Sequence, residues 1–213
     1  MKPIRIALTK GRLEKDTVAL FEALGFDCTE LHNKGRKLIL RIPDANLEVV
    51  LAKAADVITY VEHGVCDMGV VGKDTIMEYG GSFFELTDLG YGKCKFAVAG
   101  KNADDLYAGY RAKTIATKYP NVSRRFFEAK GMDVDIVKIE GSVELAPLIG
   151  LADAIVDIVE TGSTLRENGL SVLEEVVPLS ARMVVNQVSM KMENERITKL
   201  ITDLKSVLSS QEV

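Results

Sequence analysis

The amino-acid sequence predicts an α/β fold, with enough chain for two lobes. Short β-branched runs alternate with helical patterns over most of the 213 residues. Glycine or proline turns separate these segments, which is typical of βαβ units and a parallel sheet. The apolar content of 47% and the charged content of 27% are ordinary for a globular protein, and a chain of this length can bury a sizeable core.

The first part of the chain is predicted to open with a strand over residues 4–8. A basic glycine turn at 9–12 interrupts this pattern, and a helical pattern follows over 13–24 and ends at Gly25. Two runs on either side of Pro43 are predicted to pair as strands. We expect strands at 38–42, 47–51, 68–71, 83–89 and 95–99, and helices at 54–63 and from Gly72 onward.

The alternation continues in the second part of the chain. We expect strands at 114–117, 134–139, 154–159, 172–177 and 182–187, helices at 122–129 and 143–149, and a last helix with an apolar stripe of Ile197, Leu200, Ile201, Leu204, Val207 and Leu208. The glycine-rich segment 90–93 is the expected crossing into a second lobe, and Pro178 marks the expected return. Lobe I is therefore expected at 1–91 plus 181–213, and lobe II at 92–180.

Composition argues against several classes of protein. A net charge of −4 and the absence of tryptophan argue against nucleic acid as the main partner. The apolar runs are too short to span a bilayer, and the first residues lead into a strand and not into a signal peptide. No membrane partner and a cytoplasmic location are expected.

Residues 153–165 combine a strand, two acids and a hydroxyl-rich glycine turn. Asp157 interrupts the apolar run, and a buried aspartate needs a partner or a ligand. Glu160 follows at the carboxyl end of the strand, where open α/β sheets bind their ligands. The segment Thr161-Gly-Ser-Thr164 offers backbone N–H groups and hydroxyls suited to a phosphate. Because carboxylates repel phosphate, the pattern favours a ligand that also carries hydroxyls or a metal, such as a sugar phosphate.

A purely structural interpretation of this turn stays open. Residues 164–167 fit the capping-box pattern, so Ser163 and Thr164 could serve only to start a helix.

Two basic turns are candidates for binding polyphosphate oxygens. Lys10 and Arg12 follow the first strand, and Arg36 lies in the basic segment 33–37. A solvated turn is the alternative interpretation of each. The segment that begins Gly72-Lys73 is similar to the end of a P-loop, but Asp74 occupies the position of the Ser or Thr that a P-loop requires.

The pattern of residues resembles a known family over nearly the whole chain. The residues that carry its signature are Glu144 through Gly150, Ala152, Ile155, Asp157, Ile158, Thr161, Gly162, Thr164 and Leu165. Further similarity lies in Lys10–Leu13, Arg36–Leu38, Tyr60–Gly64, Asp67–Asp74, Ala116–Tyr119 and Val185–Ser189. The family is ATP phosphoribosyltransferase, which catalyses the first step of histidine biosynthesis.

The resemblance implies a fold and a set of roles. It implies two lobes of mixed or parallel sheet with flanking helices, of the periplasmic-binding-protein-like type II, with the active site in the cleft between the lobes. The implied phosphoribosyl diphosphate ligands are Asp157, Glu160, Thr161, Gly162, Ser163 and Thr164. The implied catalytic residues, which neutralise the departing pyrophosphate, are Arg12 and Arg36, and the implied nucleotide ligands are Lys10, Gly11, Gly72, Lys73 and Asp74.

The resemblance also implies a reaction and partners. Adenine N1 of ATP would attack ribose C1 of 5-phosphoribosyl 1-diphosphate and expel pyrophosphate with Mg²⁺ as cofactor, held mainly by substrate phosphates. The chain lacks the regulatory domain of longer members after Leu208 and so resembles the short form. A short form implies a hetero-oligomer in which a dimer of this chain works with a regulatory subunit related to histidyl-tRNA synthetase.

Three alternatives are weaker. A solute-binding protein could use the same fold, but the basic turns and the missing signal peptide argue against it. A salvage-type phosphoribosyltransferase usually has two adjacent acids before a longer turn, unlike Asp157 and Glu160. A dinucleotide-binding fold would need Gly-x-Gly-x-x-Gly after the first strand, and the sequence has none there.

Overall fold

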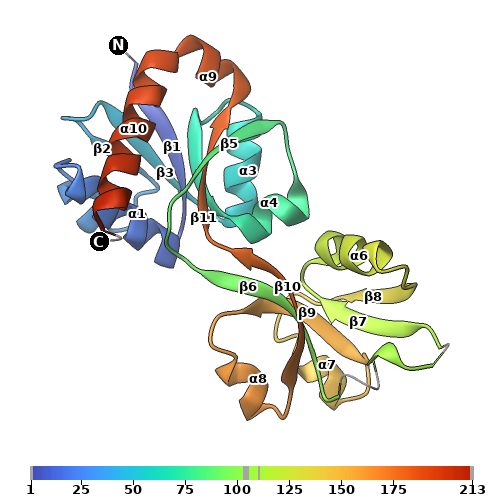
Figure 1. Cartoon of the computed structure of the whole chain (residues 1–213). Coiled ribbons are helices and arrows are strands. Elements are labelled where there is room, and N and C mark those ends of the chain that lie inside the picture. Colours follow the sequence, from blue (N-terminus) through green and yellow to red (C-terminus); the bar gives the residue numbers. More distant parts are fainter. Residues whose placement is uncertain (1, 103–105, 110, 212–213) are drawn as a thin grey trace. The chain divides into compact units, whose positions relative to one another are not determined.

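The computed structural model describes residues 2–102, 106–109 and 111–211, and the chain divides into two compact units. Unit 1 comprises residues 1–92 and 180–213, and unit 2 comprises residues 93–179. Unit 1 is therefore built from both ends of the chain, and unit 2 is inserted into it (Figure 1). No helix among the described residues is long and apolar enough to cross a membrane.

Unit 1 contains a mixed six-stranded sheet in the order β2-β3-β1-β4-β11-β5. Its strands are β1 (Ile4–Thr9), β2 (Ile39–Ile42), β3 (Leu47–Ala52), β4 (Met68–Gly72), β5 (Phe83–Asp88) and β11 (Ala181–Asn186). Strand β1 is parallel to both β3 and β4, whereas β2, β11 and β5 run antiparallel to their neighbours. The carboxyl ends of β1, β3 and β4 consequently lie at one edge of this sheet.

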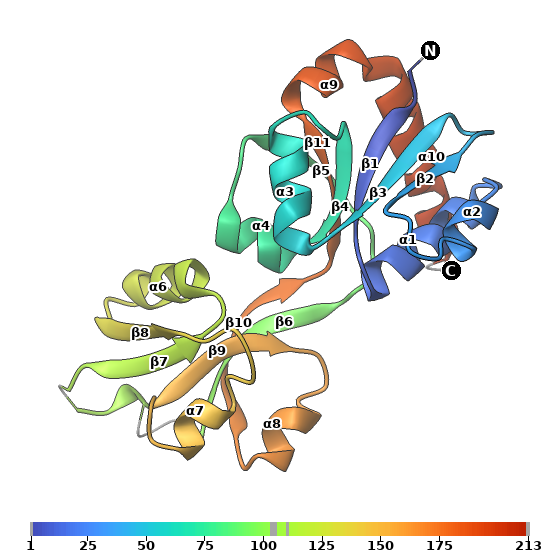
Figure 2. The same cartoon turned by 180° about the vertical axis from the view of Figure 1, so that it is seen from behind.

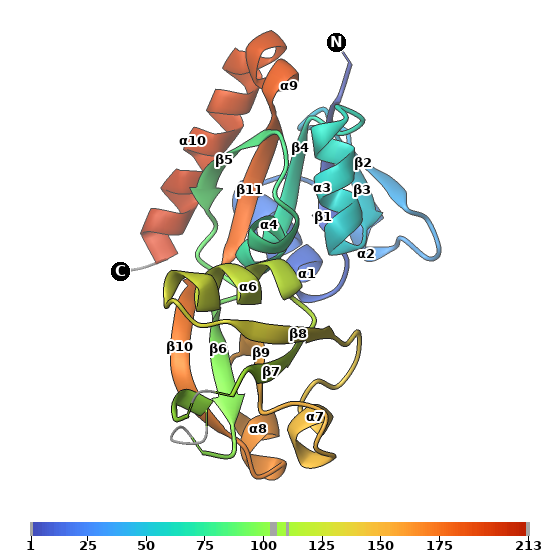
Figure 3. The same cartoon turned by 90° about the vertical axis from the view of Figure 1, so that its right-hand side faces the viewer.

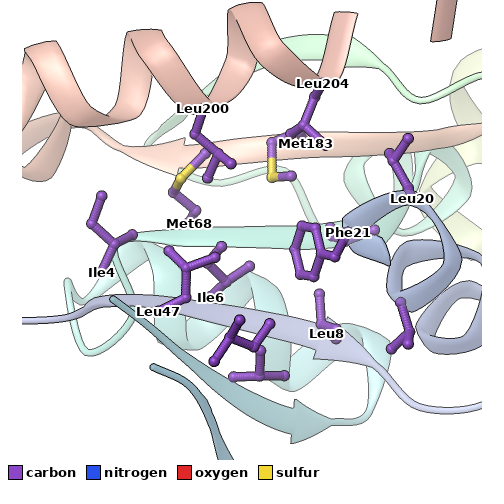
Figure 4. Close-up of a cluster of buried hydrophobic side chains, with 14 of the residues drawn as sticks. Ile4, Ile6, Leu8, Leu20, Phe21, Leu47, Met68, Met183, Leu200 and Leu204 are labelled. Atoms are coloured by element: carbon purple, nitrogen blue, oxygen red, sulfur yellow. The ribbon is translucent and has the colours of Figure 1, made fainter. Parts of the chain in front are cut away.

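Helices cover both faces of the unit 1 sheet (Figures 1 and 3). They are α1 (Arg12–Ala23), α2 (Thr29–His32), α3 (Ala54–Glu62), α4 (Lys73–Tyr79), α9 (Gln187–Met192) and α10 (Asn194–Gln211). The larger core lies between the sheet and helices α1 and α10, where Phe21 packs among side chains such as Met183 and Leu204 (Figure 4). A smaller core on the opposite face contains Val57 and Val61 of α3.

Unit 2 contains a mixed five-stranded sheet in the order β10-β6-β9-β7-β8 (Figure 2). Its elements are β6 (Cys94–Gly100), β7 (Lys113–Thr117), α6 (Pro120–Ala129), β8 (Val134–Lys138), α7 (Leu145–Leu148), β9 (Ala154–Val159), α8 (Ser163–Glu167) and β10 (Ser171–Leu179). Strands β7, β8 and β9 are parallel, and β6 and β10 add antiparallel strands. The carboxyl ends of β7, β8 and β9 therefore share an edge.

Several elements differ from the sequence-based expectations for local reasons. The helix expected at 143–149 is shorter in the structure, where α7 spans only Leu145–Leu148. Pro147 lies within it and cannot donate a backbone hydrogen bond. Pro178 does not separate two strands, because it lies inside β10, an edge strand where a missing N–H is tolerated. The strand expected to reach residue 187 ends at Asn186, whose side chain accepts hydrogen bonds from Val188 and Ser189 and caps α9.

Truncation of the buried aromatic ring of α1 should destabilise unit 1. Phe21 is fully buried, so we expect Phe21→Ala to lower the free energy of unfolding by about 3–5 kcal/mol. Phe84 is 47% exposed on β5 and provides the matched control, with an expected loss below about 1 kcal/mol for Phe84→Ala. Urea denaturation of the two variants would measure the difference, and equal losses would contradict this assignment of the core.

Candidate functional site

The strand β9 places two carboxylates at the shared edge of the unit 2 sheet. Asp157 is partly buried inside the strand, and Glu160 is exposed immediately after it. The neighbouring strand β7 ends beside β9, where the Thr117 hydroxyl donates to the Val156 carbonyl at 2.7 Å. Both acids therefore lie where parallel α/β sheets bind ligands.

The turn that follows β9 leaves its hydroxyls facing solvent. Gly162 adopts a left-handed conformation at φ +71°, which favours glycine, and α8 begins at Ser163. The Thr161 and Ser163 hydroxyls lie 3.1 Å apart, and the Arg166 guanidinium donates to the Thr161 carbonyl at 3.0 Å. The N-cap of α8 is Gly162 and no side chain caps this helix, so the alternative in which Ser163 and Thr164 serve only as helix caps is not supported.

These groups surround one cavity of about 350 Å³. Its lining comprises Glu144, Asp157, Ile158, Val159, Glu160, Thr161, Gly162, Ser163, Thr164 and Leu165. The structure thus brings together every predicted phosphoribosyl ligand and adds Glu144, which lies at the start of α7. The lining combines hydroxyls and the first backbone N–H groups of α8 with carboxylates.

The environment of Asp157 disfavours its ionised form. The pKa of this carboxyl is raised from 3.8 to about 6, mainly by burial and to a lesser extent by the nearby Glu144 charge. The Ile158 N–H donates to the Asp157 carboxylate at 2.8 Å, and this hydrogen bond and the Lys118 charge lower the pKa in part. No cation contacts this carboxylate among the residues that the structure describes. A partly desolvated carboxylate of this kind is typical of a functional position.

The basic turn after β1 forms the second group of predicted residues. Gly11 has φ +102° and precedes α1, and its N–H donates to the Glu14 carboxylate at 3.3 Å. The Lys10 N–H donates to the Ala52 carbonyl at 2.9 Å, which fixes the start of this turn against the end of β3. The Lys10 and Arg12 side chains are exposed.

A cavity of about 360 Å³ lies beside this turn. Its lining comprises Lys10, Gly11, Glu14, Lys15, Lys34, Gly35, Arg36, Lys37, Leu38 and Leu51. The fold therefore brings Lys10 and Gly11 together with Arg36, which lies in the expected basic segment. Arg12 is not part of this lining, although it directly follows Gly11.

The predicted nucleotide turn after β4 is engaged in contacts of its own. The Lys73 ammonium pairs with Glu85 at 2.6 Å, and the Lys73 N–H donates to the Ser180 carbonyl at 2.9 Å. The Asp74 carboxylate occupies the space where a side chain at Gly72 would lie. These residues do not line the cavity beside Lys10, so the structure does not gather all five predicted nucleotide ligands around one cavity.

Three residues near the cavities were not predicted as site residues. Lys118 directly follows β7 and Glu144 precedes α7, and only the fold brings these two residues near Asp157. Glu14 lies in the first turn of α1 and looks like an ordinary acidic residue at a helix start. Glu144 and Lys118 lie inside segments that match the family, whereas Glu14 lies one residue beyond the matching segment Lys10–Leu13.

Asp157 should lower stability at neutral pH. Its folded pKa of about 6 exceeds the unfolded value of 3.8, so its contribution to stability is present below about pH 4 and is lost as the pH rises through 6. Asp157→Asn removes this loss, so we expect the variant to be more stable than the parent by about 2–3 kcal/mol at pH 8. Thermal unfolding from pH 4 to 8 would measure this, and a difference that shrinks with rising pH would contradict it.

The comparisons with known proteins agree with this arrangement. The family model of ATP phosphoribosyltransferase matches residues 53–206. The chain is 60% identical over 200 residues to an ATP phosphoribosyltransferase of Clostridium kluyveri, covering 94% of this chain and 91% of that protein. It is 55% identical over 210 residues to the enzyme of that name from Clostridium acetobutylicum, covering 99% and 98%.

A solved structure extends the similarity to three dimensions. The fold matches a chain in the ATP phosphoribosyl transferase (HisG:HisZ) complex from Thermotoga maritima with a TM-score of 0.82 and 33% identity, covering 97% of this chain and 99% of that one. The sheets and helices of the two units are those of the expected periplasmic-binding-protein-like type II fold. The chain belongs to the ATP phosphoribosyltransferase family, whose members catalyse the first step of histidine biosynthesis.

Proposed function

We propose that each of the two cavities of this enzyme binds one part of the chemistry of its reaction. The cavity on unit 2 binds the 5-phosphate and the ribose of 5-phosphoribosyl 1-diphosphate, and the cavity on unit 1 binds the pyrophosphate that departs. In the reaction of the family, a bond forms between adenine N1 of ATP and ribose C1 while the bond from C1 to the pyrophosphate oxygen breaks. The reaction is a pentosyl transfer.

The observation that carries this proposal is the composition of the unit 2 cavity. A bare phosphate site would exclude carboxylates, whereas this cavity places Asp157 and Glu160 beside Thr161–Thr164. The turn supplies donors for a phosphate, and the carboxylates supply acceptors for hydroxyls. A ribose with a 5-phosphate carries both kinds of group within one small molecule.

Transition-state stabilisation is assigned to the basic turns of unit 1. Negative charge develops on the leaving pyrophosphate as the ribosyl centre becomes cationic, and preorganised cations at that position lower the barrier. Arg36 and Lys10 line the unit 1 cavity, and Arg12 is exposed next to it in sequence. Within the described chain, the Arg36 guanidinium has no protein hydrogen-bond or ion-pair partner, which leaves its donors available for pyrophosphate.

The acceptor base needs little assistance from the protein. The adenine N1 of ATP carries a lone pair and is unprotonated at neutral pH, so the reaction requires no general base. The protein instead has to orient the base in line with the bond that breaks. Gly72, Lys73 and Asp74 remain the proposed nucleotide contacts, since their turn lies at the carboxyl-end edge of β4, beside β1.

The family uses a divalent metal, and we propose Mg²⁺ for this enzyme. No group of three or more His, Cys, Asp or Glu side chains able to hold a metal ion occurs among the residues that the structure describes. The acids of the unit 2 cavity fit a metal that arrives on substrate phosphates, with Asp157 or Glu160 as the protein contribution. Mg²⁺ bound in this way would supply neutralisation of the pyrophosphate charge.

We further propose that the enzyme works in the cytoplasm as a catalytic subunit. The matched Thermotoga maritima chain belongs to a HisG:HisZ complex, and this chain covers 99% of it. A regulatory subunit related to histidyl-tRNA synthetase, bound to a dimer of this chain, is the corresponding partner. Feedback inhibition by histidine would then require that subunit.

The proposed function is tested with ATP, phosphoribosyl diphosphate and Mg²⁺. The ultraviolet absorbance change of N1-ribosylated adenine reports product, measured with and without the synthetase-like subunit. We expect product in the presence of the subunit and a lower rate in its absence. Phosphoribosyl diphosphate binding without product in either tube would indicate a different acceptor base.

The two arginines should affect turnover more than substrate affinity. We expect Arg36→Ala and Arg12→Ala to lower kcat by roughly 10²-fold, because they act on charge that develops in the transition state. Lys2→Ala, at an exposed position outside the two cavities, serves as a control for the loss of a cation. Normal turnover in Arg36→Ala would remove that residue from the site.

Asp157 should affect the ribosyl substrate and not the base. We expect Asp157→Asn to raise the Kd for phosphoribosyl diphosphate by roughly 10-fold, through loss of charge-assisted hydrogen bonds to ribose hydroxyls. Because the ionised carboxylate is the acceptor, binding to the parent enzyme should also weaken as the pH falls through about 6. Titration calorimetry at pH 8 and pH 5.5 measures both effects, and an unchanged Kd in the variant would contradict the role of Asp157.

A further inference from the structure

We propose that Glu14 is a positioning residue that joins the two basic turns of unit 1 and thereby places Arg36 for pyrophosphate. This inference rests on the proposed function of the unit 1 cavity and concerns a residue outside the expected set. Glu14 is the one acidic side chain among the described residues that line this cavity, which also contains Lys10, Lys15, Lys34, Arg36 and Lys37. Its burial requires a reason, because an acid in an anion-binding cavity opposes the ligand.

The contacts of Glu14 provide that reason. One carboxylate oxygen, Oε2, accepts the Gly11 N–H at 3.3 Å. The other, Oε1, accepts a hydrogen bond from the Lys34 ammonium in an ion pair. The Glu14 side chain is only 7% exposed, whereas that of Lys34 is 37% exposed. One buried carboxylate is thus bonded both to the turn after β1 and to the segment before β2.

The Lys34 contact fixes more than one side chain. Lys34 and Lys37 close a tight turn, in which the Lys37 N–H donates to the Lys34 carbonyl at 2.9 Å. Gly35 has φ +54° within this turn, and Arg36 follows it. Holding Lys34 in place therefore also holds the backbone of Arg36.

The cations of the cavity differ in whether Glu14 pairs with them. Lys34 is committed to the buried acid, whereas the side chains of Lys10 and Arg36 have no protein partner within the described chain. A carboxylate that neutralises one lysine lowers repulsion among the remaining cations before the ligand arrives. The geometry assigns Lys34 to the protein framework and Arg36 to the ligand.

The experiment compares six variants of the full chain in the presence of its partner subunit. They are Glu14→Gln, Lys34→Gln, the double variant of these two, Arg36→Ala, Glu14→Gln combined with Arg36→Ala, and Glu30→Gln. Binding of magnesium pyrophosphate by calorimetry and kcat from the absorbance assay are measured, with thermal unfolding recorded for each. Glu30→Gln is the matched control, because Glu30 pairs with Lys37 of the same segment at 3.3 Å but is far more exposed than Glu14.

We expect Glu14→Gln and Lys34→Gln each to weaken pyrophosphate binding at least fivefold and to lower kcat similarly. The double variant should bind pyrophosphate as well as either single variant, because each single variant already removes the same contact between Glu14 and Lys34. In the Arg36→Ala background, Glu14→Gln should cause no further loss, since Glu14 acts through Arg36. Glu30→Gln should bind pyrophosphate like the parent enzyme.

Three outcomes would overturn the inference. Normal pyrophosphate binding by Glu14→Gln would do so, as would a full additional loss in the Arg36→Ala background, which indicates a general structural role. A large effect of Lys34→Gln that Glu14→Gln does not share would show that Lys34 binds the phosphate directly. If Glu14→Gln fails to fold, Lys34→Gln is combined with Arg36→Ala instead, because this change leaves α1 unchanged. No further loss in that background supports the inference, and a full additional loss contradicts it, since Lys34 would then act on the phosphate directly.

These results also separate the inference from the proposed function. Normal binding and turnover in Arg36→Ala would contradict the assignment of the unit 1 cavity to pyrophosphate. Impaired Arg36→Ala together with normal Glu14→Gln would contradict only the role of Glu14.

Discussion

Parallel pairing of strands at the centre of each sheet is the constraint on which the sites depend. Strand β1 pairs with β3 and β4, and β7 pairs with β8 and β9, all in parallel. Parallel strands require every connection to return to the same edge, so turns far apart in sequence end side by side. The basic turn after β1 and the acidic turn after β9 each lie at such an edge. Without this pairing, neither turn would lie beside the other residues that line its own cavity.

Glu14, which is buried, and Asp157, which is partly buried, differ in how the protein compensates their charge. Glu14 has a lysine and a backbone N–H in contact, so its charge is compensated within the protein. Asp157 has one N–H donor from its own chain neighbour and a second acid nearby, so its charge is disfavoured until something else compensates it. An acid whose charge is compensated within the protein can hold other residues in place, whereas an acid whose charge is not compensated can bind a ligand. The contrast supports the assignment of Glu14 to positioning and of Asp157 to substrate.

The sequence predicted the parts of the fold that depend on local pattern. The apolar run of β9 and the paired strands β2 and β3 follow from side-chain periodicity and turn residues, and the structure confirms them. It did not predict α9, because Asn186 ends a strand and caps a helix at one position, and propensity alone does not reveal a cap. The expectation that Pro178 separates two strands was wrong. Proline is tolerated inside an edge strand, and the edge position of β10 depends on the order of strands in the sheet, which the local sequence does not reveal.

The same distinction applies to the sites. The residues from Asp157 to Thr164 are continuous in sequence, so one segment was enough to predict the unit 2 cavity. Glu144 and Glu14 were missed because their roles depend on contacts across the fold, such as the ion pair of Glu14 with Lys34. Neither residue type nor spacing encodes that pair, and only the packing of the segment before β2 onto α1 creates it.

The position of β11 in the unit 1 sheet has a consequence for synthesis on the ribosome. This strand lies between β4 and β5, yet the whole of unit 2 separates it from them in sequence. Until residues 181–186 emerge, β5 has no partner and β4 has an open edge, and exposed edges invite pairing with other chains. All of unit 2 is synthesised before β11, so unit 2 can fold while the unit 1 sheet still lacks this strand.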